Sequence, residues 1–525
     1  YNVAIGDEAG TAITTGDENV AVGYAALDNS DVGSYNTAIG KSALGNDSKG
    51  SRSTAVGNSA LQTQNFTSAT TAYNSAFGYN AGGAVTTGTN NTLIGGLAGD
   101  AITTASDNTA VGYASLGANT TGIRNVAVGA TALDANTTGY DNIGVGVASL
   151  GVHTTGYANI AIGSYALDAN TTANHNIGIG RYALSSNTTG ASNTAIGNDS
   201  LAANTTASNN TAVGATALDA NTTGTENVAV GAGALTANTT GSYNHAFGRN
   251  AGAAITTGAT NIAIGNAALS TATTADGNTA IGHNTLAANT SGASNVAVGA
   301  NALDANTSAS NNTAVGYAAL TANTTGTPNV AIGRGALGAN TTGGGNTAVG
   351  DIALGNNTTA SGNTAVGRNS MNVNTEGHSN SALGDTALFR NTTGDKNVAV
   401  GMNALDHNTT ADNNTAVGYD ALTANTTGAS NVAVGTDALK TATTASNNVA
   451  VGYAALTDNT SGTANTASGD QALANNTTGS SNTAMGTSAL VANTTADNNT
   501  AVGYAALTAN IDGHSNTAVG DTALD

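Results

Sequence analysis

The sequence predicts an all-β protein, a parallel β-solenoid (β-roll), and three observations support this fold class. A glycine-terminated motif, N-[TV]-A-[VI]-G, returns every 17 residues along almost the whole chain. The unit between two copies is too short to hold an amphipathic helix beside its turn signals. The 525 residues include 70 Gly, 1 Pro, no Trp and only 4% aromatic residues, so large side chains for an ordinary globular core are missing. Units this small bury little alone, and we therefore expect them to stack as coils.

The count of repeats predicts about 31 coils of 17 residues. The marker glycine stands first at Gly6 and last at Gly520, and its phase breaks only between Gly57 and Gly78, where four extra residues occur. We expect this insertion, near 62–73, to bulge outward as a loop. Disorder is disfavoured because apolar residues keep a fixed phase and the mean hydropathy of −0.08 is near neutral.

Each part of the unit has its own structural signal. Numbered from its leading Asn, the unit reads N-[TV]-A-[VI]-G-x-x-A-L-x-A-N-T-T-[GA]-x-x, as in the copy that begins with Asn125–Gly129. The β-branched residues before the glycine predict a short strand. The A-L-x-A segment predicts a second short extended or turn segment. N-T-T-G is a turn signature, because Asn and Gly tolerate left-handed backbone angles.

Stacked coils align identical positions into ladders. We expect Asn ladders through Asn125 (position 1) and Asn136 (position 12), because stacked side-chain amides bond along the stacking direction. Val128 (position 4) and Leu133 (position 9) are expected to form apolar rows inside the coil. Alternate strand residues face opposite sides, so this places Ala127 (position 3) outside, as the small-residue interface of a homotrimer. The alternative is that Ala127 only lines a tight, two-sided core.

Composition and charge exclude several classes of function. The net charge of −20, from 31 acidic and 11 basic residues, makes nucleic acid an unsuitable partner. No cysteine is present, which removes disulfides and thiolate metal sites. No apolar run reaches the roughly 18 residues of a membrane-spanning helix, so we expect no membrane span in this segment. Nothing in the sequence predicts a cofactor.

An enzyme is not predicted. No catalytic motif stands out, and glycine spacing follows from the repeat. The histidines lie mostly at different positions of the unit and are spread along the chain, whereas catalytic or metal-binding histidines must converge. They are His153, His175, His245, His283, His378, His407 and His514.

The acidic composition raises calcium binding as an alternative. The recurring acid is an Asp at position 10, as in Asp134, Asp168, Asp219 and Asp304. One carboxylate per coil is a poor cage for an ion that takes 6–8 oxygens, so no metal site is predicted.

Three surface functions remain as alternatives. N-T-T and N-T-S are formal acceptors for glycosylation, although a turn-forming Asn explains them equally; the candidates are Asn119, Asn136, Asn170 and Asn187. Threonine rows raise ice binding, but adjacent Thr-Thr in a turn does not make the T-x-T face of a strand. Recurrent Tyr at position 6, as in Tyr113 and Tyr317, either stacks on glycans or covers a turn.

The motifs N-V-A-V-G at Asn125–Gly129, N-V-A-I-G at Asn329–Gly333 and N-T-A-I-G at Asn193–Gly197 resemble the head repeats of trimeric autotransporter adhesins, the YadA-like heads. The resemblance covers essentially the whole chain. It implies a left-handed β-roll in which three chains form one fibre that serves in surface attachment.

The unit is equally similar to repeats of phage tail fibres, as in N-T-A-V-G-Y-A-A-L at Asn499–Leu507. Residues 1–525 begin and end inside a repeat, and we expect one continuous segment of a longer fibre. The predicted function is a non-enzymatic extracellular or cell-surface shaft or head that displays a binding tip. Its partners would be sister copies, with glycans or receptors bound elsewhere. A virion tail fibre and an ice- or carbohydrate-binding solenoid are the alternatives.

Overall fold

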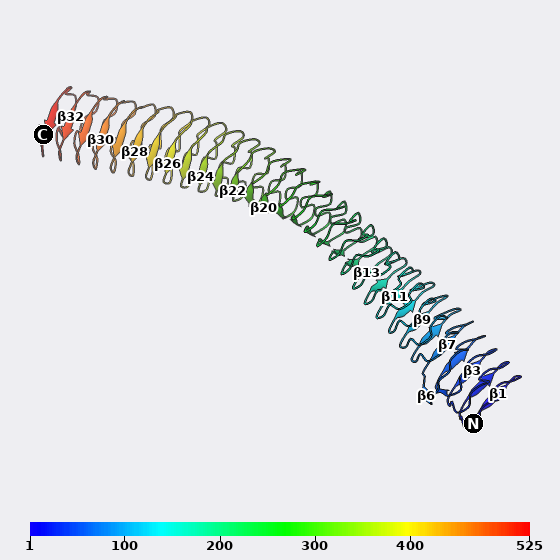
Figure 1. Ribbon diagram of the computed structural model, residues 1–525. Helices are drawn as coiled ribbons and strands as arrows, with labels where there is room; N and C mark the ends of the chain where they lie inside the picture. The colour runs from blue at the N-terminus through cyan, green and yellow to red at the C-terminus, as the bar shows by residue number, and fades with distance from the viewer. The chain divides into compact units, whose positions relative to one another are not determined.

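The computed structural model describes residues 1–525 and contains two compact units, Tyr1–Thr260 and Asn261–Asp525. Each unit is a parallel β-solenoid without helices, built from coils of 17 residues, which confirms the predicted fold class. Within each unit the short strands of successive coils lie side by side (Figure 1).

The strands are two or three residues long, and all except β4 and β6, which pair with each other in a separate sheet, occupy the same place in every coil. The strands of the first unit are β1 (Val3–Ile5), β2 (Val20–Val22), β3 (Thr37–Ile39), β4 (Gly50–Ser51), β5 (Thr54–Val56), β6 (Thr70–Thr71), β7 (Ser75–Phe77), β8 (Thr92–Ile94), β9 (Thr109–Val111), β10 (Val126–Val128), β11 (Ile143–Val145), β12 (Ile160–Ile162), β13 (Ile177–Ile179), β14 (Thr194–Ile196), β15 (Thr211–Val213), β16 (Val228–Val230) and β17 (His245–Phe247). Those of the second unit are β18 (Ile262–Ile264), β19 (Thr279–Ile281), β20 (Val296–Val298), β21 (Thr313–Val315), β22 (Val330–Ile332), β23 (Thr347–Val349), β24 (Thr364–Val366), β25 (Ser381–Leu383), β26 (Val398–Val400), β27 (Thr415–Val417), β28 (Val432–Val434), β29 (Val449–Val451), β30 (Thr466–Ser468), β31 (Thr483–Met485), β32 (Thr500–Val502) and β33 (Thr517–Val519).

Neighbouring strands pair in parallel, one coil apart. In β10 and β11, for example, Val126 lies opposite Ile143 and Val128 opposite Val145. The backbone ladder continues beyond the strands: the Leu133 N–H donates to the next coil at 3.0 Å, and so does the Thr137 N–H at 2.9 Å. Every coil is therefore bonded to its neighbours around most of its path, as a solenoid requires.

The interior of each coil is filled by small residues opposite a leucine. Ala127, Ala132 and Leu133 (positions 3, 8 and 9) are fully buried, whereas Val128 is half-buried on the outside. The prediction that position 4 fills the interior and position 3 faces outward is therefore wrong. Position 3 has room for a methyl group and little more in most coils: a Cβ added to Gly144 in the next coil would lie 3.0 Å from Ser149 Oγ and 3.4 Å from Leu133 Cγ.

The wall opposite the strand is a tight turn segment rather than a second strand. Its residues at positions 7 and 9 have positive φ, including Thr131 (φ 53) and the buried Leu133 (φ 52). A left-handed conformation costs a non-glycine residue roughly 1–2 kcal/mol. Burying a leucine side chain gains roughly 1.5–3 kcal/mol. The leucine row is thus stable because its burial offsets the conformational cost.

Some coils fill the same interior in another way. In the coil of β8, Gly99 replaces the leucine of position 9 and Ile102 replaces the Asn of position 12. A Cβ on Gly99 would lie 2.8 Å from Ile102 Cδ1, so the isoleucine occupies the space of the missing leucine. The pairs Gly10/Ile13, Gly82/Val85 and Gly252/Ile255 repeat this exchange.

The four-residue insertion lies where the sequence places it, between β5 and β7, which pair directly across it. A buried polar cluster closes the coil at this point. Asp47 Oδ2 accepts a hydrogen bond from Gln64 Nε2 at 2.6 Å, and Gln64 Oε1 accepts one from Asn74 Nδ2 at 2.8 Å. The longer Gln64 takes the place of the usual Asn of position 12. Burial raises the pKa of the Asp47 carboxyl.

Candidate interaction surface

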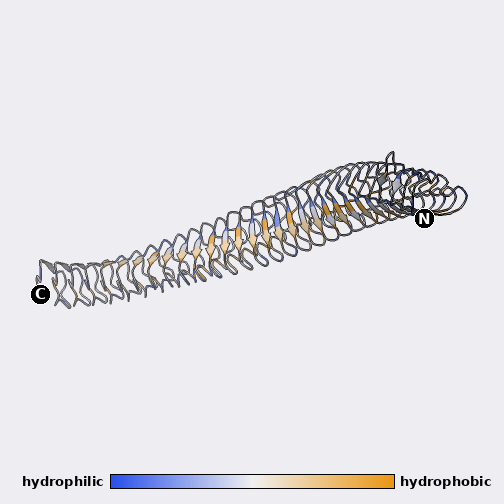
Figure 2. Ribbon diagram, turned by 90° about the horizontal axis from the view of Figure 1, so that it is seen from below, coloured by the Kyte–Doolittle hydropathy of each residue, from blue (hydrophilic) through white to orange (hydrophobic).

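One face of each unit consists of the outward residues of the strands, at positions 2 and 4, and we call it the strand face. Position 2 carries mostly Thr, Val or Ile, and position 4 carries Val or Ile with a few other apolar residues and one serine, Ser468. Side chains at these positions are half-buried or exposed in the single chain. In Figure 2 the strands appear largely in orange and pale shades.

The strand face is free of charge. None of the 31 acidic and 11 basic residues stands at position 2 or 4 of any coil. Large apolar side chains are nevertheless open to solvent there; examples at 37–51% exposure are Phe77, Ile162, Ile196, Phe247, Ile332, Leu383 and Met485. A long apolar surface of this kind is typical of an interaction site rather than of a solvated face.

Charged side chains lie at other positions of the coil, some of them at the edges beside the strands. Arg124 and Asp141, at position 17 of successive coils, form an ion pair with a closest distance of 2.6 Å. Arg334 and Asp351 do the same at position 6, at 2.8 Å. The arginine lowers the pKa of its partner carboxyl in both pairs. These pairs are exposed and join neighbouring coils, so they add little to stability.

Two ladders of buried asparagines support the strand face from behind. Asn125 and Asn136 are both fully buried. Asn125 Oδ1 accepts from the backbone N–H of Asn142 in the next coil at 3.0 Å, and Asn136 Nδ2 donates to Asn119 Oδ1 at 3.1 Å. The predicted Asn ladders are present and link adjacent coils. Gly129 forms the corner after the strand, where a Cβ would lie 2.5 Å from the carbonyl oxygen of Gly146.

The glycosylation candidates do not lie at the surface. Asn119, Asn136, Asn170 and Asn187 are 0% exposed, and each side-chain nitrogen donates to a backbone carbonyl of its own corner. A glycan on such a nitrogen would break the ladder and have no space inside the coil. The burial of these side chains favours the alternative explanation, in which the asparagines form the turn.

The threonines of the corner are partly used by the backbone. Thr137 Oγ1 donates to the carbonyl oxygen of Thr154 at 3.1 Å, and Thr120 Oγ1 donates to that of Thr137 at the same distance. The next threonine, such as Thr138, is exposed. Adjacent Thr residues thus differ in role, and only one row of them faces solvent.

The other candidate residues remain apart from one another. The structure has no pocket, and no three His, Asp or Glu residues gather as metal ligands would. Asp134 and Asp168 are half-buried, and burial raises the pKa of both carboxyls. Tyr113 and Tyr317 are 62% and 59% exposed.

His153 is the one histidine inside an Asn ladder. Its imidazole replaces the position-12 Asn, is fully buried, and bonds the Gly156 carbonyl through Nε2 at 2.9 Å. Burial lowers its pKa. Two buried atoms lack a hydrogen-bond partner at this point, His153 Nδ1 and Asn136 Oδ1.

The comparisons with known proteins return no relative: no family model matches the chain, and no curated protein is similar to it. None of its segments is a helix long and apolar enough to cross a membrane.

The strand face was not predicted from the sequence, because Val or Ile at position 4, being larger than Ala at position 3, was expected to fill the interior. The signal that identifies the outward positions is present in the sequence. Position 3 is almost always Ala or Gly, as the narrow interior demands, while positions 2 and 4 vary in size yet never carry charge.

Proposed function

We propose that residues 1–525 form one continuous shaft of a homotrimeric extracellular fibre, an adhesin-like surface filament without enzymatic activity. Its role is mechanical: the shaft gives length and stiffness and displays a binding tip that recognises glycans or other receptors. The trimeric state and a left-handed coil follow from the resemblance to YadA-like heads.

The observation that carries this proposal is the charge-free strand face. Its apolar rows repeat with the period of the chain, so a surface of matching length and period is available on another copy of the same chain. Parallel assembly would bring Val and Ile rows of sister chains together and bury the apolar groups now exposed at positions 2 and 4. Charged residues at the edges would stay in water.

Sedimentation of the chain tests the proposal. We expect a mass three times the 50.3 kDa of the monomer. Val315→Asp with Val349→Asp places two carboxylates on the strand face and is expected to reduce assembly. Ala318→Asp with Ile352→Asp adds the same charge to the same coils at position 7 and is the matched control. A stable wild-type monomer at micromolar concentration would overturn the proposal.

A phage tail fibre shares the same shaft role and differs in where the fibre is attached. The sequence unit resembles both groups equally. The coding sequence that follows residue 525 separates them: an anchor and stalk support the cell-surface filament, whereas a self-cleaving chaperone domain supports the virion fibre.

Ice binding is the second candidate function, because the strand face presents Thr at position 2 beside Val or Ile at position 4 in many coils. Thr109 and Val111 in β9 are one such pair. The array is broken by Val, Ile, Ser or His at position 2 of other coils, including His245. An interrupted array suits a protein interface better than an ordered water lattice. Thermal hysteresis in a solution of the chain would favour ice binding.

A further inference from the structure

The strand face is not uniform, and its most apolar part lies in three consecutive coils of the first unit. These coils carry β11, β12 and β13, whose outward residues are all Ile or Val: Ile143, Val145, Ile160, Ile162, Ile177 and Ile179. Elsewhere Ile occupies position 2 only at Ile262. The residues pair in register, Ile143 with Ile160 and Ile160 with Ile177. We call these coils the isoleucine block.

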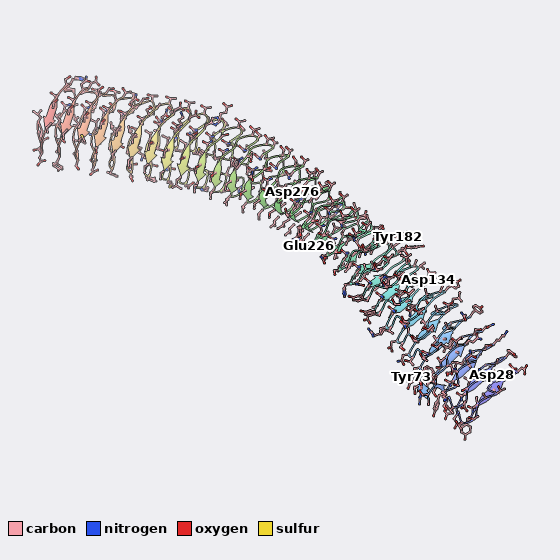
Figure 3. The ribbon with its side chains drawn as sticks, viewed as in Figure 1. Asp28, Tyr73, Asp134, Tyr182, Glu226 and Asp276 are labelled. Atoms are coloured by element: carbon pink, nitrogen blue, oxygen red, sulfur yellow. The ribbon has the colours of Figure 1, made fainter.

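Aromatic ladders flank the isoleucine block at both ends of its strands. Before the strands, the Tyr140 and Tyr157 rings stack with centroids 5.0 Å apart, and His175 meets Tyr157 edge-on at 5.1 Å. After the strands, Tyr165 and Tyr182 stack at 5.3 Å. Every aromatic stack in the structure lies beside these strands, with Tyr140 contributed by the end of the preceding coil, that of β10. Figure 3 shows that Tyr182 and Tyr73, the latter at position 17, project from opposite sides of the first unit.

A fibre of near-identical coils has a register problem. If copies of the chain pack through a strand face that repeats every 17 residues, sliding one copy by one coil replaces each contact with a similar one. Weakly specified register is a known hazard of repetitive β structure. Only coils that differ from the consensus can distinguish the aligned state from a shifted one.

We propose that the isoleucine block is a register key, which aligns sister copies of this chain in the fibre. The inference rests on the proposed assembly through the strand face. In the aligned state the Ile and Val side chains of the block meet their equivalents in the other copies. A shift of one coil would place Ile143 or Ile177 against a coil outside the block, such as that of Thr194. It would also leave part of the aromatic ladders without an equivalent in the other copy. The aligned state is therefore favoured by apolar burial at this segment.

Cross-linking measures register directly, because the chain has no cysteine of its own. Chains carrying Thr92→Cys are mixed with chains carrying Thr109→Cys, which stand at position 2 of adjacent coils. A direct disulfide, which forms only between cysteines whose Cα atoms are about 4.4–6.8 Å apart, joins identical cysteines when copies are aligned and unlike cysteines when they are shifted by one coil. In the parent sequence we expect aligned products to exceed shifted ones at least tenfold.

The triple variant Ile143→Thr, Ile160→Thr and Ile177→Thr removes the register key. It should preserve the fold, because Thr is the commonest residue at position 2. We expect the aligned-to-shifted ratio to fall to about one while sedimentation still shows an oligomer. The control is Val398→Thr, Val432→Thr and Val449→Thr, outside the block. Adding Thr194→Ile, Thr211→Ile and Val228→Ile to the triple variant that lacks the register key creates an isoleucine block in other coils and should restore alignment.

The outcomes separate this inference from the proposed function. A wild-type monomer in sedimentation would overturn both. An oligomer whose aligned-to-shifted ratio is unchanged by the block substitutions would overturn the register key alone. An equal loss of alignment in the control would overturn it as well, because alignment would then depend on total apolar content.

Discussion

Asn125 and Asn136 donate to the same acceptor, the carbonyl oxygen of Gly139, from Nδ2 atoms at 2.9 and 3.1 Å. The two residues lie in different Asn ladders, at positions 1 and 12, and their side chains meet at the Asn-Thr-Thr-Gly corner of their own coil. This shared carbonyl ties the strand of one coil to the closing turn of that coil. It explains why both asparagines recur with such regularity.

The shared acceptor predicts coupling between the two ladders. At the equivalent corner, Asn295 and Asn306 donate to the Ala309 carbonyl at 2.9 and 3.1 Å. Asn295→Ala and Asn306→Ala should each lower local stability by about 1–3 kcal/mol, since each leaves buried polar groups without partners. The double variant should cost more than the sum, because only it removes both donors from the carbonyl. Amide hydrogen exchange of this coil is the measurement, with Ser308→Ala at the exposed turn as the control; additive effects would contradict the coupling.

The glycine at the end of each strand is predicted to be the least tolerant position. Gly316 has φ 136, and an added Cβ would lie 2.5 Å from the carbonyl oxygen of Gly333. Gly316→Ala should therefore separate the coils of β21 and β22 and reduce their hydrogen-exchange protection. Gly335→Ala is the control: its Cβ would have no neighbour nearer than 3.9 Å, and its φ of 63 costs alanine about 1–2 kcal/mol. Equal losses in the two variants would contradict the close-contact explanation.

Some coils carry Gly in place of Leu at position 9 and Ile in place of Asn at position 12. We expect these two replacements to compensate for each other when both are made in one coil. Leu218→Gly should destabilise its coil by roughly 2–5 kcal/mol through the cavity it leaves. Asn221→Ile alone should also destabilise, because the isoleucine competes with Leu218 for one space and the link to Asn204 Oδ1 is lost. The double variant should be more stable than either single one, as in the natural pair Gly252/Ile255. Thermal unfolding of the three variants measures this, and a double variant worse than both singles would refute it.

His153 predicts a stabilising substitution with a defined pH dependence. Its folded pKa lies below the ordinary value of 6.5, so the unfolded chain binds more protons and stability is lost as pH falls through that value. His153→Asn should abolish this loss and raise local stability at neutral pH by about 1 kcal/mol, because the new Nδ2 can donate to the unpartnered Asn136 Oδ1. Hydrogen exchange of the coil between pH 5 and pH 8 measures both effects. An unchanged pH slope in the variant would show that His153 is not its source.

The fold was predictable because its determinant is local and repeated. The glycine of position 5, the Asn of positions 1 and 12, and the 17-residue period each specify backbone geometry wherever they occur, so the coil and its ladders followed from residues such as Asn125 and Gly129. The orientation of the strand did not follow. Alternation shows that Ala127 and Val128 face opposite sides, but both are apolar, so hydropathy alone does not say which side is inside.

The sequence by itself determined that this protein is a β-solenoid of 17-residue coils, because turn residues and periodicity act over a few residues. Only the tertiary structure decided that alanine faces the interior and the Val and Ile rows face outward. That choice depends on the distance between the strand and the turn that carries Leu133, and this distance arises from packing across the coil. The same packing buries the Asn side chains that the sequence presented as glycosylation sites, and it aligns the Ile residues of β11, β12 and β13 in register on the strand face.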